Sequence, residues 1–203
     1  MVFKKTILLL LILVSVNCFS QDEENTDITN VTKVTFWSPG MSYEKRIGKF
    51  QSLYARVFIS WAFSIGGSSS SDGILGDFYV DPTLTLNYRY YYNFSRRAAN
   101  GKRTELNSSN YFSPIFEALF TKGSLSSSDL IEKNRRPIKT FGIVWGFQRN
   151  YTKRFSLDLN LGAGFFYGKS TAINNAGELT KKTVGHFSST GRLNLGFWLN
   201  KKH

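Results

Sequence analysis

The chain has 203 residues, which suits one domain of ordinary size. Its formal net charge is +12, and 16% of its residues are aromatic. The basic residues gather in turns and at strand ends and form no recognisable nucleic-acid module, so nucleic acid is not an expected partner. A single Cys excludes an intrachain disulfide framework.

Residues 1–20 predict a cleaved signal peptide. Lys4 and Lys5 form a positive start, and the apolar run from Ile7 to Val16 is too short for a membrane-spanning helix. Ser20 provides a small residue just before the expected cleavage site. Export without a helical anchor leaves the periplasm, the medium or the outer membrane as destinations.

Cys18 permits a competing interpretation, in which the leader carries a lipid attachment site. A lipobox needs an aliphatic residue three positions before the Cys and a small residue just before it, whereas this chain has Ser15 and Asn17. We therefore expect Cys18 to be discarded with the leader. The polar, acidic residues 21–30 that follow predict a flexible N-terminus.

From Val31 onward, apolar and polar side chains alternate with a period of two, which is the signal of a β-strand. The clearest strands are Phe155–Tyr167 and Val80–Phe94, each long enough to cross a bilayer when tilted. Four further strands are expected at Ser52–Ile65, Phe112–Phe120, Ile138–Gln148 and Phe187–Leu199.

Two short strands complete an even number if the segment Val31–Ile47 divides at the turn signal Ser38-Pro39-Gly40. The alternative is one bent strand and an odd total. The expected connections at one end are 48–50, 95–110 and 150–153. Those at the other end are the Pro39 turn and three longer segments: 67–77, 122–137 and 169–185.

Together these features predict an all-β fold, a single antiparallel transmembrane β-barrel of about eight strands over residues 31–203. In this arrangement the apolar face of each strand contacts lipid and the polar face is enclosed. The expected location is the outer membrane of a Gram-negative cell.

The polar faces carry charges of both signs, and all of them point to the same side of the sheet if the strand phases are right. An eight-stranded barrel is narrow enough to be filled by side chains, and buried charges must be paired. We therefore predict a structural charge network in the lumen; the alternative is a gated pore or a ligand site. The expected members are Glu44, Arg56, Arg89, Glu117, Asp158 and Arg192.

An aromatic group precedes Arg96 and Arg97, and it comprises Tyr88, Tyr90, Tyr91, Tyr92 and Phe94. We interpret it as a girdle at the level of the lipid headgroups. A stacking platform for a sugar or a nucleic acid would use the same residue types and is the alternative interpretation.

Evidence for catalysis is thin, and no enzymatic activity is predicted. His186-Phe187-Ser188 resembles the His-x-Ser pattern of the outer-membrane lipid A deacylases, but Asn200 stands near the place of their Glu. The strand phase also turns His186 and Ser188 toward the lumen rather than the lipid. No metal-ligand spacing or phosphate loop is found, so neither a metal nor a cofactor is expected.

Two segments resemble outer-membrane β-barrel proteins of unknown function from Bacteroidetes-type bacteria. One is Pro39–Lys49 with Gln51–Tyr54, and the other is Arg89–Asn93 with Gly101-Lys102 and Asn107–Tyr111. The resemblance implies the fold and the location and carries no catalytic residues. One departure is the C-terminus, where Trp198 is followed by Leu199, Asn200, Lys201, Lys202 and His203 instead of ending on an aromatic residue.

The expected function is therefore a structural or interaction role in the cell envelope. The expected partners are outer-membrane lipid, lipopolysaccharide and the barrel assembly machinery, with any protein partner unidentified. Two alternatives remain, a soluble exported β-barrel that binds a small apolar ligand and a barrel enzyme that modifies lipid A.

Overall fold

The computed structural model describes residues 27–66, 75–122, 135–173 and 177–201. These residues form eight strands and two short helices. The strands are β1 (Val31–Thr35), β2 (Gly40–Gly48), β3 (Gln51–Gly66), β4 (Leu75–Tyr90), β5 (Asn110–Thr121), β6 (Arg136–Asn150), β7 (Phe155–Ile173) and β8 (Leu179–Trp198). The predicted signal peptide lies outside the described residues.

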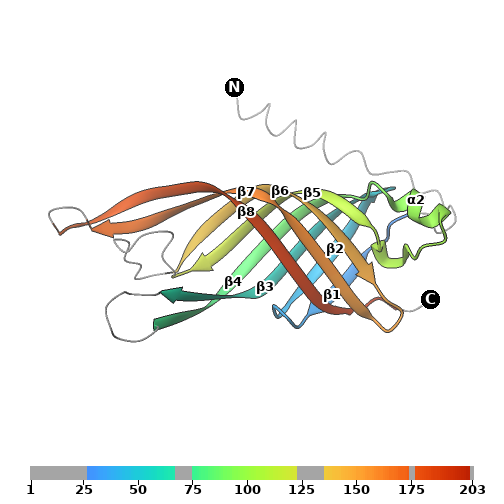
Figure 1. Ribbon diagram of the computed structural model, residues 1–203, viewed down its shortest axis with the longest axis horizontal. Coiled ribbons are helices and arrows are strands. Elements are labelled where there is room, and N and C mark those ends of the chain that lie inside the picture. Colours follow the sequence, from blue (N-terminus) through green and yellow to red (C-terminus); the bar gives the residue numbers. More distant parts are fainter. Residues whose placement is uncertain (1–26, 67–74, 123–134, 174–176, 202–203) are drawn as a thin grey trace, which may run out of the picture.

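All eight strands belong to one antiparallel sheet, in which neighbours along the chain are also neighbours in space (Figure 1). β1 pairs with β8, and this contact closes the sheet into a ring. The prediction of an all-β, eight-stranded antiparallel fold is confirmed. The division at Ser38-Pro39-Gly40 is confirmed as well, because β1 and β2 form a hairpin around it.

The two faces of the ring differ sharply in polarity. On β2, the side chains of Ser42 and Glu44 are buried inside the ring while Met41 and Tyr43 are exposed outside it. The same alternation recurs on β3, β6 and β7 where their side chains are described, and exposed apolar residues of the ring include Val57, Ile143, Leu161, Phe165 and Phe187. This inverts the usual pattern of a water-soluble protein, whose apolar residues lie inside.

Two hairpins are longer than the hydrophobic alternation predicts. The segment 169–185 was expected to be a loop, but β7 and β8 remain paired as far as Ile173 and Leu179. The expected connection 67–77 overlaps β4, which already begins at Leu75 opposite Gly66. The outer part of the β7–β8 hairpin is rich in Lys and Thr and has no apolar face. The alternation of apolar and polar residues therefore could not predict a strand there.

The connection between β4 and β5 also differs from the prediction. β4 ends at Tyr90, and the chain then forms the helix α2 (Phe94–Ala99) and the 3-10 helix η1 (Glu105–Asn107). Tyr91 and Phe94, both predicted to belong to the aromatic girdle, are instead buried. They lie in a small apolar cluster with Ile28, Tyr111 and Val144.

Residues 27–30, the described part of the segment 21–30 that is predicted to be flexible, contact the ring; residues 21–26 lie outside the described part of the chain. Ile28 is fully buried in that cluster, and its amide donates to the carbonyl of Lys49 at 3.3 Å. Thr29 exchanges two hydrogen bonds with the side chain of Asn107, at 2.7 and 2.8 Å. Together with α2 and η1, this segment covers the end of the ring at which β1 begins and β8 ends (Figure 1).

Gly146 on β6 makes room for a large side chain in the interior. A Cβ atom at this position would lie 2.5 Å from Cζ and 2.6 Å from Oη of Tyr111. We expect Gly146→Val to lower the free energy of unfolding by about 1–3 kcal/mol, because the phenol group of Tyr111 has no room to move in the filled interior of the closed sheet. Urea unfolding followed by Trp fluorescence measures this, and an unchanged midpoint would show that the interior is loosely packed.

Candidate functional site: the charged interior

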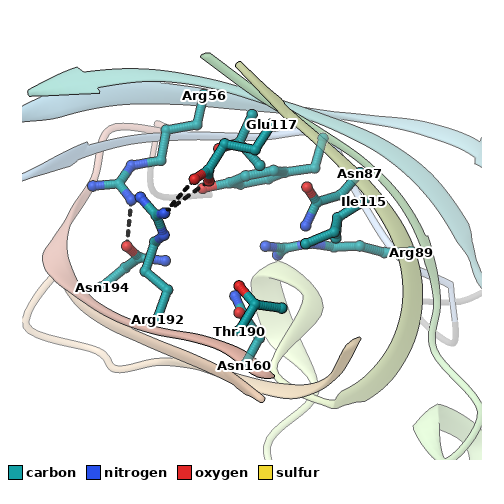
Figure 2. A pocket seen from close by; sticks show the side chains of 11 residues that line it. Arg56, Asn87, Arg89, Ile115, Glu117, Asn160, Thr190, Arg192 and Asn194 are labelled. Atoms are coloured by element: carbon teal, nitrogen blue, oxygen red, sulfur yellow. Dashed lines mark hydrogen bonds and ion pairs between the residues drawn. The ribbon is translucent and has the colours of Figure 1, made fainter. Parts of the chain in front are cut away.

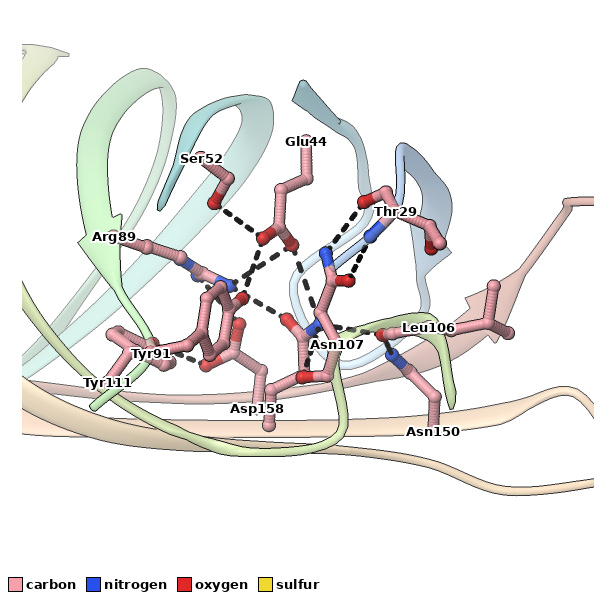
Figure 3. Close-up of polar contacts among 11 residues, drawn as sticks. Thr29, Glu44, Ser52, Arg89, Tyr91, Leu106, Asn107, Tyr111, Asn150 and Asp158 are labelled. Atoms are coloured by element: carbon pink, nitrogen blue, oxygen red, sulfur yellow. Dashed lines mark hydrogen bonds and ion pairs between the residues drawn. The ribbon is translucent and has the colours of Figure 1, made fainter. Parts of the chain in front are cut away.

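A fully buried ion-pair cluster lies near the covered end of the ring (Figure 3). The Arg89 guanidinium contacts the Asp158 carboxylate at 2.7 Å and the Glu44 carboxylate at 3.7 Å. The three residues come from β4, β7 and β2, which are not adjacent strands of the sheet, so strand pairing does not explain why they are in contact. Ring closure brings them together.

Neutral donors satisfy the remaining oxygens of the two carboxylates. Ser52 and Tyr91 each donate a hydroxyl hydrogen bond of 2.6 Å to Glu44, and Tyr111 donates one of 2.7 Å to Asp158. Burial, followed by the nearby Glu44 charge, raises the pKa of Tyr91 well above its ordinary value. Tyr91 therefore keeps its hydroxyl proton and can donate it in a hydrogen bond to the buried Glu44 carboxylate.

Arg89 is also held between aromatic rings. Its guanidinium carbon lies 3.8 Å from the ring centroid of Tyr54 and 4.3 Å from that of Tyr111. Gln148 accepts a further hydrogen bond from Arg89 at 2.7 Å. These side chains are all buried, so the cluster fills this end of the interior.

The hydroxyl of Tyr111 offers a direct test of this cluster. We expect Tyr111→Phe to cost about 1–3 kcal/mol of unfolding free energy, because Asp158 then loses a buried donor. Tyr90→Phe is the matched control, since it removes the same atom from the exposed outer face. Equal urea midpoints for the two variants would argue against a buried Tyr111–Asp158 bond.

A second charged group lies farther from the covered end (Figure 2). The Arg192 guanidinium contacts both oxygens of Glu117, at 2.9 and 2.7 Å. The guanidinium carbons of Arg56 and Arg192 both lie over the Phe58 ring, 4.0 and 4.3 Å from its centroid. Arg56 binds neutral oxygens, donating to Thr35 Oγ1 at 2.9 Å, to the Ser38 carbonyl at 2.8 Å and to Asn194.

The six residues predicted from the sequence thus all lie on the inner face but form two groups. Glu44, Arg89 and Asp158 make one, and Glu117 with Arg192 makes the other. Arg56 joins the second group through the Phe58 ring, and it has no carboxylate within ion-pair distance among the described residues.

Several inner residues were not among those predicted from the sequence. Lys33 is buried on β1, and its ammonium has no hydrogen-bond partner in the described part of the chain. Lys33 follows the buried Val31 by two residues and therefore lies on the same, inner face of β1. Because β1 is short, this period of two was a weak signal in the sequence. Asp81 pairs with Arg135 at 2.9 Å near the other end, and Tyr91 and Tyr111 donate to the carboxylates of Glu44 and Asp158.

Between the two groups lies a small polar cavity of about 20 Å³ (Figure 2). Three side chains on its wall present buried polar atoms without a described partner: Arg56 Nε, Arg89 Nε and Asn87 Oδ1. A space of this size holds one or two water molecules or one small polar group. It has no room for a cofactor of ordinary size.

His186 and Ser188 lie on the same face of β8 as Arg192 and Asn194, the face predicted to point inward, and Phe187 lies on the outer face. His186 is exposed and stacks on Phe166, with the ring centroids 5.3 Å apart. It stands on the projecting part of β8, beyond the enclosed interior, because that hairpin extends past its neighbours. Among the described residues, no cluster of three His, Cys, Asp or Glu side chains could hold a metal ion.

The fold and the site define an all-β protein with one closed eight-stranded antiparallel sheet and a charged, filled interior. No family model, curated protein or solved structure matches this chain. The described residues contain no helix long and apolar enough to cross a membrane.

Proposed function

We propose that this protein is a small outer-membrane β-barrel with a sealed lumen, which serves the cell envelope as a structural or interaction protein and not as an open channel. The observation that supports it best is the inverted polarity of the ring. Exposed Phe, Leu, Ile, Val and Trp side chains cover the outside, while Glu44, Arg89 and Asp158 are buried inside.

The height of the apolar surface agrees with a bilayer. On β3, the segment from Ser52 to Trp61 carries outward Leu53, Val57 and Trp61. Ten residues extend about 33 Å along a strand, or roughly 25 Å along the axis of a barrel whose strands tilt by about 40°. Outer-membrane barrels expose an apolar band of about this height.

Aromatic residues mark both borders of this band. Tyr90, Tyr92 and Phe112 are exposed near the covered end, and Trp145 donates a hydrogen bond of 2.9 Å to the Tyr92 hydroxyl. Trp61 and Phe120 are exposed toward the other end. Amphipathic rings of this kind favour the interface between hydrocarbon and water.

The covered end would face the periplasm in this proposal. β1 begins there and β8 ends there. Two connections at this end are short, the one between Gly48 and Gln51 and the one between Asn150 and Phe155. Outer-membrane barrels keep both termini and their short turns on the periplasmic side. The long hairpins β3–β4 and β7–β8 would then project outside the cell.

The soluble alternative fits the geometry poorly. A soluble ligand-binding barrel needs an apolar cavity and a polar coat. Here the cavity is polar and small, and the coat is apolar.

Cell fractionation combined with heat-modifiability on a gel tests the proposal. We expect the protein to separate with the outer membrane and to change its migration on boiling, because folded barrels resist detergent. Release by osmotic shock without a migration shift would overturn the proposal. In planar bilayers, a steady open conductance would contradict the sealed lumen.

A further inference from the structure

The outward side chains of β6 and β7 change from aromatic to cationic toward one end of the ring. On β7, Phe165 and Tyr167 are exposed on the outer face, and the next outward position is Lys169. On β6, the exposed Phe141 is followed toward the same end by Lys139. The aromatic rings belong to the apolar band, so the lysines begin where we expect the hydrocarbon to end and the headgroups to begin.

The register of the strands brings three exposed lysines close together. Lys139 on β6 lies opposite Tyr167 on β7, so Lys169 is its diagonal neighbour on the outer face. Lys169 lies opposite Thr183 on β8, which makes Lys181 its diagonal neighbour on that strand. Diagonal neighbours on one face of an antiparallel pair are about 7–8 Å apart. We call Lys139, Lys169 and Lys181 the lysine row.

The charges of the lysine row are not neutralised within the described part of the chain. All three side chains are exposed, and none of them makes an ion pair or a side-chain hydrogen bond with another described residue. Ammonium groups at this spacing repel one another, and an anion bound among them removes that repulsion. The row therefore favours an anionic ligand.

Three exposed aromatic rings lie on the membrane side of the lysine row. In the strand register Phe141 is opposite Phe165, and Phe165 is opposite Phe187. Their exposed fractions are 54%, 47% and 73%. The outer face thus offers an apolar surface directly beside a cationic one. A ligand that fits both surfaces combines an anionic head with hydrocarbon chains.

The lysine row lies at the end of the ring opposite the covered end (Figure 1). Lys139 is close to the start of β6, which ends near the covered end, and Lys169 and Lys181 belong to the projecting β7–β8 hairpin. In the orientation proposed above, this end faces the outside of the cell. The row extends over roughly 15 Å, twice the diagonal spacing, so it is longer than one phosphate group and suits two.

We propose that the lysine row binds the two phosphate groups of a bisphosphorylated glycolipid such as lipid A. The acyl chains of the glycolipid lie against the rings of Phe141, Phe165 and Phe187. This inference rests on the proposed membrane location and orientation and goes beyond them, since it names one lipid of the outer leaflet and assigns its site on the outer face.

Native mass spectrometry of the purified protein, folded in micelles of a neutral detergent, tests the inference. The probe is bisphosphorylated lipid A, and the comparison lipids are monophosphorylated lipid A and phosphatidylglycerol. We expect one molecule of the probe to bind about tenfold more tightly than either comparison lipid, because only the probe places two phosphates along the lysine row. Equal binding of all three lipids would show a general attraction to phosphate and would overturn the inference.

A triple variant with Lys139→Gln, Lys169→Gln and Lys181→Gln should bind lipid A about a hundredfold more weakly, since each lysine beside an anionic lipid contributes roughly a fivefold change in affinity. Its matched control should bind like the unchanged protein, because it removes the same charge from three exposed positions near the covered end: Lys45→Gln, Lys102→Gln and Lys153→Gln.

Each variant is first checked for heat-modifiability, which shows that it is folded. Equal losses of lipid A binding in the two triple variants would contradict a site at the lysine row. A heat-modifiable protein without a preference for lipid A would overturn this inference alone. Release of the protein by osmotic shock, without a migration shift, would overturn the membrane proposal as well.

Discussion

Arg89→Met should lower the free energy of unfolding by about 3–5 kcal/mol, the largest effect expected for any single inner residue. The substitution keeps most of the side-chain volume and removes the charge that faces Asp158 at 2.7 Å and Glu44 at 3.7 Å. Both carboxylates would then remain buried without a cation. Urea unfolding of the protein folded into lipid vesicles measures the loss.

Arg46→Met is the matched control, because Arg46 also pairs with a carboxylate, that of Asp27, but is 42% exposed. An exposed pair contributes about 0–1 kcal/mol. The double variant Arg89→Met with Asp158→Asn should recover part of the stability, since it leaves one buried carboxylate fewer. Equal losses for Arg89→Met and Arg46→Met would show that the cluster is not buried.

Ile143→Arg should destabilise the membrane-inserted protein by about 2–4 kcal/mol, because Ile143 lies near the middle of the apolar band and is 67% exposed on the outer face. In a water-soluble protein the same change would be nearly neutral, since surface substitutions usually alter stability by less than about 0.5 kcal/mol.

Leu199→Arg provides the control for position. Leu199 is exposed just after the end of β8, at the border of the band, where an added arginine costs about 0–1 kcal/mol. Folding yields into vesicles, followed by the gel shift, compare the two variants. A wild-type yield for Ile143→Arg would contradict contact between this face and hydrocarbon.

The alternation of side chains along the strands predicted the inner and outer faces correctly. Thr140, Val144 and Gln148 on β6 lie inside, and Phe141 and Ile143 lie outside, as the period of two required. The six charged residues follow the same logic. A period of two is a local property of the chain, so a single sequence is enough to read it.

The pairing of charges was not predictable in the same way. Arg89 contacts Asp158 on β7 because the ring closes with a particular offset between β1 and β8, and no local pattern encodes that offset. The period of two in the sequence identifies the inner and outer faces of each strand, whereas the closure of the sheet determines which inner side chains contact one another.

The helices between β4 and β5 were missed for a local reason. α2 has no side-chain capping bond at Asn93 and no acidic residue in its first turn, so its start carries no recognisable signal. Its position comes from tertiary contacts instead. Phe94 packs into the apolar cluster, and Arg97 donates to the carbonyl of Ser108 at 3.0 Å.

The central claim is that the apolar outer face contacts lipid, and spin-label accessibility measures this most directly. A nitroxide at Leu161, which is 55% exposed in the middle of β7, is compared with one at Lys153 in the short turn before that strand. In vesicles the account predicts frequent collisions of the Leu161 label with oxygen and few with a water-soluble nickel complex, and the reverse at Lys153. Equal access of the nickel complex to both labels would contradict the account.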